Sequence, residues 1–156
     1  MLTIIPTLEI MKAVTDINVQ GVGAEIRRES FDVATDLISR ASVEVVLEGG
    51  LYGRVKTRLS DDHCRFMESV YRINNSVIGV VGYGSFEAIK WIAKAESRTN
   101  IVIILTENPS DYQLSTSDVK VIKPADFIDR VKRAESYCNK GMFTSLTDAL
   151  VSSIMM

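Results

Sequence analysis

The feature that most constrains the fold of this chain is a set of short apolar runs separated by segments with helical spacing. Ile101–Leu105 (IVIIL) contains no polar residue, which is typical of a strand buried on both faces of a parallel sheet. The runs at 2–5, 43–47, 77–81 and 119–122 are similarly short and rich in branched residues. This alternation predicts an α/β fold with a central, mostly parallel sheet of about four to five strands and helices on both faces.

The same pattern runs through the whole chain and indicates a single domain. The 156 residues fit one domain, since domains typically hold roughly 100–200 residues. The composition, 46% hydrophobic and 24% charged, is ordinary for a globular protein. We therefore expect residues 1–156 to form one three-layer domain, with residues 141–156 as a C-terminal helical extension.

Capping residues and apolar spacing place the helices between the strands. Ser30 is the expected N-cap of a helix of about ten residues, and Trp91 lies at apolar spacing in the helix expected over 85–97, where we expect it to pack in the core. The other helices are expected at 7–14, 51–59, 60–73, 124–137 and 146–154.

Charge and cysteine usage exclude several classes of protein. A formal net charge of −2 argues against a surface that is basic throughout, but clusters such as Arg27 and Arg28 leave a local basic groove possible. His63 is the only histidine and the two cysteines are far apart, which excludes a Cys/His zinc site. Unpaired thiols fit a cytoplasmic location. No run approaches the roughly 18 apolar residues of a membrane span.

A glycine turn in mid-chain offers one candidate binding site. Gly82-Tyr83-Gly84 follows an expected strand and precedes an expected helix, an arrangement in which free backbone amides favour a phosphate. Glu107 follows Gly82 by 107 − 82 = 25 residues, near the position of a ribose-binding acid. Glu87 stands where a third glycine is usual, and its carboxylate would repel a phosphate. A nucleotide-binding module using Gly82, Gly84 and Glu107 is therefore an alternative and not the main prediction.

The C-terminal half carries a family resemblance. The segments FEAIKWIAKAE, IVIILTENPSDY and VKVIKPADFIDRV resemble the PIN-domain family of small nucleases, in which a helix precedes an apolar strand, a Thr-x-Asn/Asp loop, a short strand and a Pro-x-x-Phe helix. The resemblance spans about 50 residues. More loosely, LTIIPTLEIMKAV and VEVVLEGGLYGRV match the family's first strand and its second acidic region. The resemblance implies a PIN-like or Rossmann-like fold.

PIN chemistry requires three or four carboxylates that hold Mg²⁺ or Mn²⁺ and activate water for ribonuclease cleavage. This chain has Pro6 and Thr7 where the family's first strand ends in an aspartate, and Asn108 at a usual acid position. The resemblance implies site residues in two roles. The catalytic ones would be Glu48, Glu87 and Asp111, and the substrate-binding ones Thr106, Asn108 and Arg54.

We therefore expect a PIN-like domain that is catalytically impaired, needs no cofactor, and binds nucleic acid or a protein partner. An active ribonuclease dependent on Mg²⁺ or Mn²⁺ is the alternative. The segment FDVATDLISRASVEVV also resembles bacterial microcompartment shell proteins, which leaves a structural role open. The apolar tail at 146–156 should pack on its own domain or on a symmetric partner, so we expect a homodimer or higher homo-oligomer.

Overall fold

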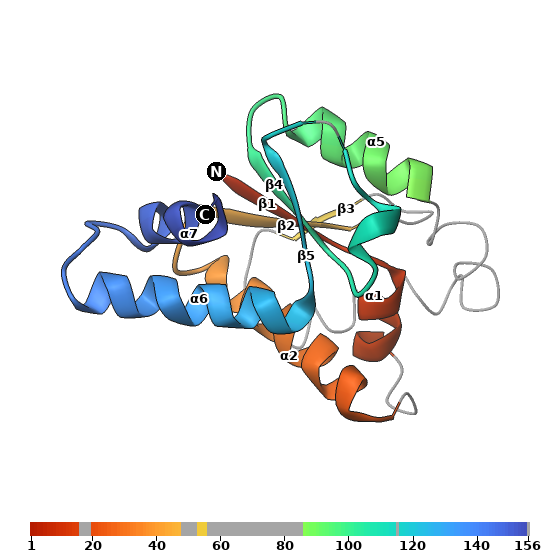
Figure 1. The fold of residues 1–156 in the computed structure, drawn as a ribbon, viewed down its shortest axis with the longest axis horizontal. Coiled ribbons are helices and arrows are strands. Elements are labelled where there is room, and N and C mark those ends of the chain that lie inside the picture. Colours follow the sequence, from red (N-terminus) through yellow and green to blue (C-terminus); the bar gives the residue numbers. More distant parts are fainter. Residues whose placement is uncertain (16–19, 48–52, 56–85, 115, 156) are drawn as a thin grey trace.

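The computed structural model describes residues 1–15, 20–47, 53–55, 86–114 and 116–155, and shows a five-stranded sheet with helices on both faces (Figure 1). The strand order is β3-β2-β1-β4-β5. β1, β2, β4 and β5 run parallel to their neighbours, and β3 is antiparallel to β2. The expected α/β class with a mostly parallel sheet is confirmed. The strands are β1 (Leu2–Pro6), β2 (Val43–Leu47), β3 (Gly53–Val55), β4 (Ile101–Leu105) and β5 (Val119–Ile122).

The most apolar run of the sequence lies inside the sheet, as its composition predicts. β4 pairs with β1 from Leu2↔Ile101 to Pro6↔Leu105 and with β5 on its other side. Val102 and its three successors are fully buried, because helices cover both faces of the strand. A continuous apolar run is stable only in such a two-sided environment.

One face of the sheet is covered by four helices, which lie below the strands and beside them in Figure 1. Alternate residues of β1, such as Leu2 and Ile4, point to this face and pack with Phe31 of α2 and Phe127 of α6. Burying each of these side chains contributes about 1.5–3 kcal/mol. The helices are α1 (Leu8–Thr15), α2 (Val22–Leu37), α6 (Pro124–Asn139) and α7 (Leu146–Met155).

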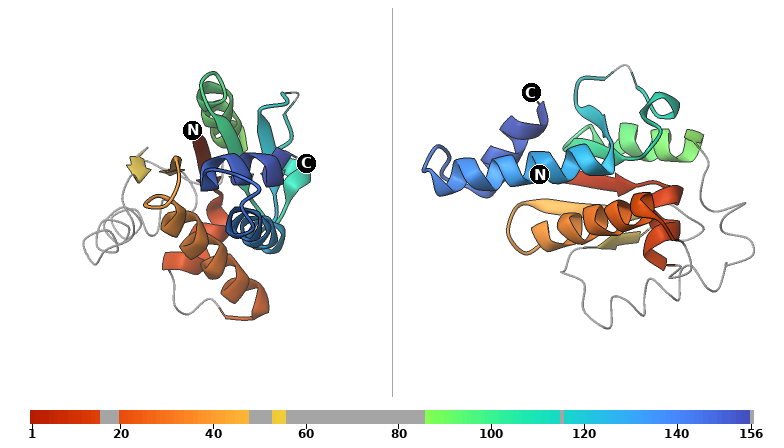
Figure 2. Two further views of the ribbon diagram at one scale, coloured as in Figure 1. Left: turned by 90° about the vertical axis from the view of Figure 1, so that its left-hand side faces the viewer. Right: turned by 60° about the horizontal axis from the view of Figure 1, so that its bottom comes forward.

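The opposite face carries α5 (Phe86–Glu96), as two views of the ribbon also show (Figure 2). Ile89 and Ala93 of α5 are buried against Val102 and Ile104, the residues of β4 that point away from the first face. The helix therefore packs on the sheet through one apolar side, while Glu87, Lys94 and Ala95 are exposed.

Two local expectations were wrong. The helix expected to start at Ser30 begins at Val22, with Gly21 as its N-cap at φ 112°, a backbone angle that glycine adopts without strain. Ser30 is instead buried inside the helix, where its hydroxyl donates to the Arg27 carbonyl at 2.7 Å. Within the segment 51–59, expected to be helical, Gly53–Val55 forms β3 because pairing with β2 overrides local helical preference.

Several expectations lie outside the described residues: the helix at 60–73, the strand at 77–81 and the turn at 82–84. The apolar tail is described, and it forms α7, which packs on α6 of the same chain. Arg130 Nη1 donates to the carbonyls of Ser153 at 3.0 Å and Ile154 at 2.9 Å, which caps the end of α7. The tail's apolar side is thus covered within one chain, and homo-oligomerisation stays a prediction without support from this segment.

Candidate functional site

The strand order places a topological switch point at the carboxyl ends of β1 and β4. The chain moves from β1 to β2 on one side of the sheet and returns to β4 on the other side of β1. Open α/β sheets bind ligands where the order reverses in this way, outside the carboxyl ends of the two central strands. We call this region, residues 6–9 and 105–108, the carboxyl edge.

Threonine side chains join the two strands at the carboxyl edge. Thr7 follows β1, and its hydroxyl donates to the Leu105 carbonyl at 2.9 Å. The Thr7 backbone amide reaches the same carbonyl at 3.1 Å. Thr7 is fully buried, so it holds the end of β1 against the end of β4 and offers nothing to a ligand.

Glu9 organises the loop that follows β4. It lies in the first turn of α1, and its Oε1 atom accepts hydrogen bonds from the Thr106 hydroxyl at 2.5 Å and from the Glu107 amide at 3.0 Å. The Thr106 hydroxyl accepts in turn from the Asn108 amide at 3.0 Å. Hydrogen bonds to a carboxylate are among the stronger ones in proteins, so this network fixes the backbone of residues 106–108.

Glu107 makes a second link across the carboxyl edge. Its Oε1 atom lies 3.4 Å from Nε of Arg27 on α2, and both side chains are a little over one quarter exposed. The Arg27 Nε atom is buried and makes no hydrogen bond, so the contact is an ion pair without hydrogen-bond geometry. The pair neutralises the carboxylate that the nucleotide-binding alternative assigns to a ribose.

Two of the three carboxylates that the sequence assigned to catalysis, Glu87 and Asp111, lie in the described structure, and both are exposed. Glu87 is 88% exposed on α5 and pairs with Lys90 at 3.6 Å. Asp111 is exposed in the 3-10 turn Pro109–Asp111. Their neighbours Phe86 and Tyr112 do touch, edge to face, with ring centroids 5.2 Å apart. Even so, no group of three metal-binding side chains occurs among the described residues.

Of the other site residues predicted from the sequence, the structure describes some and not others. Thr106 is fully buried and engaged by Glu9, whereas Asn108 is exposed at the end of β4. Arg54 belongs to β3 and pairs in register with Val46, and its side chain is not among the described ones. Glu48, Gly82 and Gly84 lie outside the described residues.

Sequence reasoning missed the roles of Glu9 and Arg27, which the structure places at the carboxyl edge. The signal for Glu9 was present: it is the first acid after the first strand, and the Thr-Glu-Asn loop follows the most apolar strand. Carboxyl ends of parallel strands share one edge of a sheet, so both segments belong to the same edge, although the sequence does not say that β1 and β4 are neighbours. Arg27 had no such signal, because the sequence predicts the start of its helix only at Ser30, whereas α2 begins at Val22.

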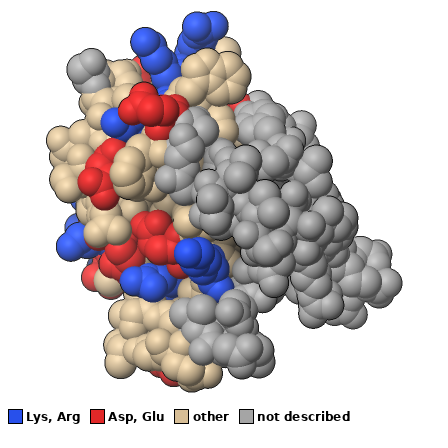
Figure 3. Space-filling view, turned by 90° about the vertical axis from the view of Figure 1, so that its right-hand side faces the viewer, with Lys and Arg blue, Asp and Glu red and all other residues tan. Residues whose placement is uncertain are grey.

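The surface at this end of the sheet carries both signs of charge. Figure 3 shows acidic and basic side chains interspersed over its described part, with no continuous basic area. This surface can present the Asn108 amide and a fixed loop backbone to a ligand. The Glu9 oxygen that holds the loop already accepts two hydrogen bonds, so it is a poor ligand for a metal ion.

Two further observations concern a membrane location and the resemblance to microcompartment shell proteins. None of the described helices has both the length and the apolar character that crossing a bilayer requires. The segment likened to microcompartment shell proteins is the second half of α2 together with β2, and the shell-like role stays a prediction about assembly.

Comparison with known proteins adds no relative. The chain matches no family model, and no curated protein or solved structure matches it. Its functional assignment therefore rests on the sequence pattern and on the geometry of the described residues.

Proposed function

We propose that this chain is a PIN-like domain that has lost metal-dependent cleavage and acts by binding single-stranded nucleic acid. The observation that carries the proposal is the state of the carboxylates at the carboxyl edge. Glu9 is held by the Thr106 hydroxyl and the Glu107 amide, and Glu107 is paired with Arg27. These groups stabilise the fold at the place where a nuclease would bind its metal ions.

A working metal site needs carboxylate oxygens that are free to converge on one ion. Mg²⁺ requires oxygen ligands at about 2.0–2.1 Å in nearly octahedral geometry. Coordination through Glu9 Oε1 would compete with the two hydrogen bonds that hold the loop at 106–108, and recruiting Glu107 would draw it away from Arg27. These contacts support a role of Glu9 and Glu107 in holding the fold at the carboxyl edge.

Nucleic acid is the favoured partner because the carboxyl edge presents an amide where the resemblance places a substrate-binding residue. Asn108 is exposed at the end of β4, and its backbone is fixed through Thr106. An amide offers both donors and an acceptor, which suits the edges of unpaired bases. A protein partner remains the alternative outcome of the experiment.

The proposal is tested with a labelled 12-nucleotide RNA of unstructured sequence, with and without Mg²⁺ or Mn²⁺. We expect binding in fluorescence anisotropy, no metal-dependent product on a gel, and no saturable metal binding in calorimetry at micromolar concentrations. The Glu9→Gln and Asp111→Asn variants should behave as the wild type does in the cleavage assay.

Two results would contradict the proposal. Cleavage that requires Mg²⁺ or Mn²⁺ and disappears in Asp111→Asn would establish a working nuclease. Absence of RNA binding even at low salt would exclude nucleic acid as the partner. A protein that binds the purified chain directly would then support the alternative, a protein partner.

A further inference from the structure

Trp91 is the largest departure of the structure from the expected core. It was expected to be inside, yet it is 70% exposed on α5, while its neighbours Ile92 and Ala93 are buried. The narrow apolar side of α5 is filled by other residues, so the indole points away from the sheet. Such a large ring in water gains free energy when a partner covers it.

Two cations follow Trp91 along α5 and the turn after it. With 3.6 residues per turn, Lys94 lies one turn further on and Arg98 two turns, in the turn that continues α5 through the bond from the Ser97 amide to the Ala93 carbonyl. Lys94 and Arg98 are exposed, and in the described part of the chain neither has an ion pair. We call Trp91, Lys94 and Arg98 the α5 surface.

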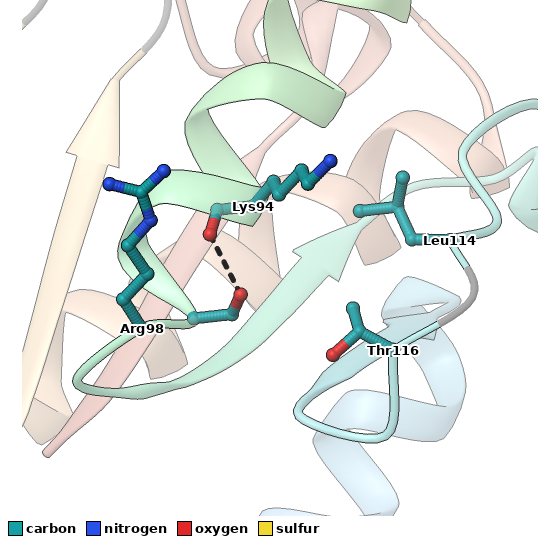
Figure 4. Close-up of a pocket in the computed structure, with 5 residues that line it drawn as sticks. Lys94, Arg98, Leu114 and Thr116 are labelled. Atoms are coloured by element: carbon teal, nitrogen blue, oxygen red, sulfur yellow. Dashed lines mark hydrogen bonds between the residues drawn. The ribbon is translucent and has the colours of Figure 1, made fainter.

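A pocket of about 370 Å³ adjoins the α5 surface. It lies between the end of α5 and the segment before β5, and Figure 4 shows the Lys94 side chain reaching toward Leu114 while Arg98 extends the other way. The volume is within the range of roughly 300–1,000 Å³ typical of small-ligand sites. Its lining combines cations, hydroxyls and one apolar side chain: Lys94, Ser97, Arg98, Leu114 and Thr116.

Two carboxylates of α5 lie near the α5 surface. Glu96, which falls between Lys94 and Arg98 in the sequence, is buried and accepts a hydrogen bond from the Asn100 side-chain amide at 3.3 Å. Glu87, one turn before Trp91, is already paired with Lys90. A second depression of about 350 Å³, at the start of β4, is lined by Arg98 but also by Asp118. A phosphate is therefore favoured on the Leu114 side, where the described lining contains no carboxylate.

We propose that the α5 surface and the pocket beside it bind single-stranded nucleic acid, with Trp91 stacked on a base and Lys94 and Arg98 in contact with phosphates. An aromatic platform next to unpaired cations is the arrangement by which proteins hold single strands without reading sequence. This inference rests on the proposed function for its partner class, and it adds a contact on α5 to the one proposed for Asn108 at the carboxyl edge.

The chain provides its own probe, because Trp91 is its only tryptophan. Titration of the full chain with the unlabelled 12-nucleotide RNA should quench the intrinsic fluorescence, since stacking places a base on the indole. Anisotropy of the labelled RNA should give the same dissociation constant. A rise in anisotropy without any change in tryptophan fluorescence would overturn the proposed stacking.

Substitutions separate the two kinds of contact. Trp91→Ala should weaken binding about tenfold, as expected for the loss of one base stack. Lys94→Gln with Arg98→Gln should weaken binding and reduce the slope of log K against log salt by about 1.4, which corresponds to two phosphate contacts. Met142→Ala and Lys132→Gln, at exposed positions elsewhere, are the matched controls and should change neither affinity nor slope.

The results distinguish failure of the proposed binding site on α5 from failure of the proposed function. If RNA binds but the α5 variants bind as the wild type does, while Asn108→Ala weakens binding, the site is at the carboxyl edge and the inference is wrong while the proposed function stands. If the wild type binds no RNA at low salt, the proposed function fails and the inference with it. A protein partner lost in Trp91→Ala, without RNA binding, would also overturn the inference.

Discussion

The carboxyl edge and the α5 surface both carry polar groups, but these groups are in opposite states. At the carboxyl edge the Thr106 hydroxyl is buried and every described carboxylate close to it has a partner within the chain. On the α5 surface Trp91 is mostly exposed and the cations beside it have no partner in the described residues.

This difference separates residues that hold the fold from residues available to a ligand. A buried group that already makes its hydrogen bonds would lose them on binding something else, and the loss costs free energy. An exposed ring or an unpaired cation has only water to lose. The carboxyl edge lies where a sheet of this strand order is expected to bind a ligand. Most of its described polar groups, however, are already hydrogen-bonded or ion-paired within the chain and hold the fold together.

The largest effect should come from removing the carboxylate at the centre of the carboxyl edge. Glu9→Ala leaves the Thr106 hydroxyl and the Glu107 amide without their acceptor. We expect the free energy of unfolding to fall by about 2–3 kcal/mol, measured by urea denaturation. Glu25→Ala removes an exposed acid in the first turn of α2 and should change stability by less than about 0.5 kcal/mol. Equal effects would show that the Glu9 network is not a scaffold.

A smaller effect is expected from the ion pair between Arg27 and Glu107. Both side chains are partly exposed, so solvent screens the attraction, and a double-mutant cycle with alanine should give a coupling energy of about 0.5–1 kcal/mol. The Arg40–Glu135 pair, at 3.3 Å and more exposed, serves as the reference and should couple more weakly. A coupling near zero for Arg27 and Glu107 would make Glu107 available to a ligand and weaken the contrast between the two regions.

Substitution on the α5 surface should leave stability almost unchanged. Trp91 is 70% exposed, so Trp91→Ala should shift the free energy of unfolding by no more than about 0.5 kcal/mol, although the same variant is expected to lose RNA affinity. Thermal and urea denaturation provide the measurement. A destabilisation of about 2 kcal/mol or more would mean that Trp91 packs in the fold and would remove the basis of the contrast.

The smallest effect concerns Asp32, which lies on α2 and belongs to neither region. Partial burial, and then repulsion from Glu29, raise the pKa of the Asp32 carboxyl above its usual range. The folded state therefore disfavours the ionised form, so Asp32 lowers stability above its raised pKa, and this cost disappears as the pH falls below the usual carboxyl range. Asp32→Asn should raise Tm by about 1–2 °C at pH 7, and the gain should shrink toward pH 3.5. A gain independent of pH would point to a cause other than ionisation.

The sequence by itself determined the identity of most elements that the structure describes. The runs Val43–Leu47 and Ile101–Leu105 were predicted to be strands and form β2 and β4. The prediction succeeds because a short run of apolar, branched residues favours a buried strand through its own composition. The helices after Pro124 and Leu146 were also assigned correctly. From this alternation the parallel sheet followed, since parallel strands need a crossover between them.

Only the tertiary structure decided which of these elements meet. Glu9 and Thr106 are 97 residues apart in sequence, and their hydrogen bond depends on β1 lying beside β4, which no local pattern encodes. Pairing with β2 turned Gly53–Val55 into a strand. Trp91 fits an apolar helical spacing, yet it is exposed because Ile89, Ile92 and Ala93 already fill the side of α5 that meets the sheet. Periodicity tells which residues can be buried, but the area that the neighbouring elements offer decides which of them are.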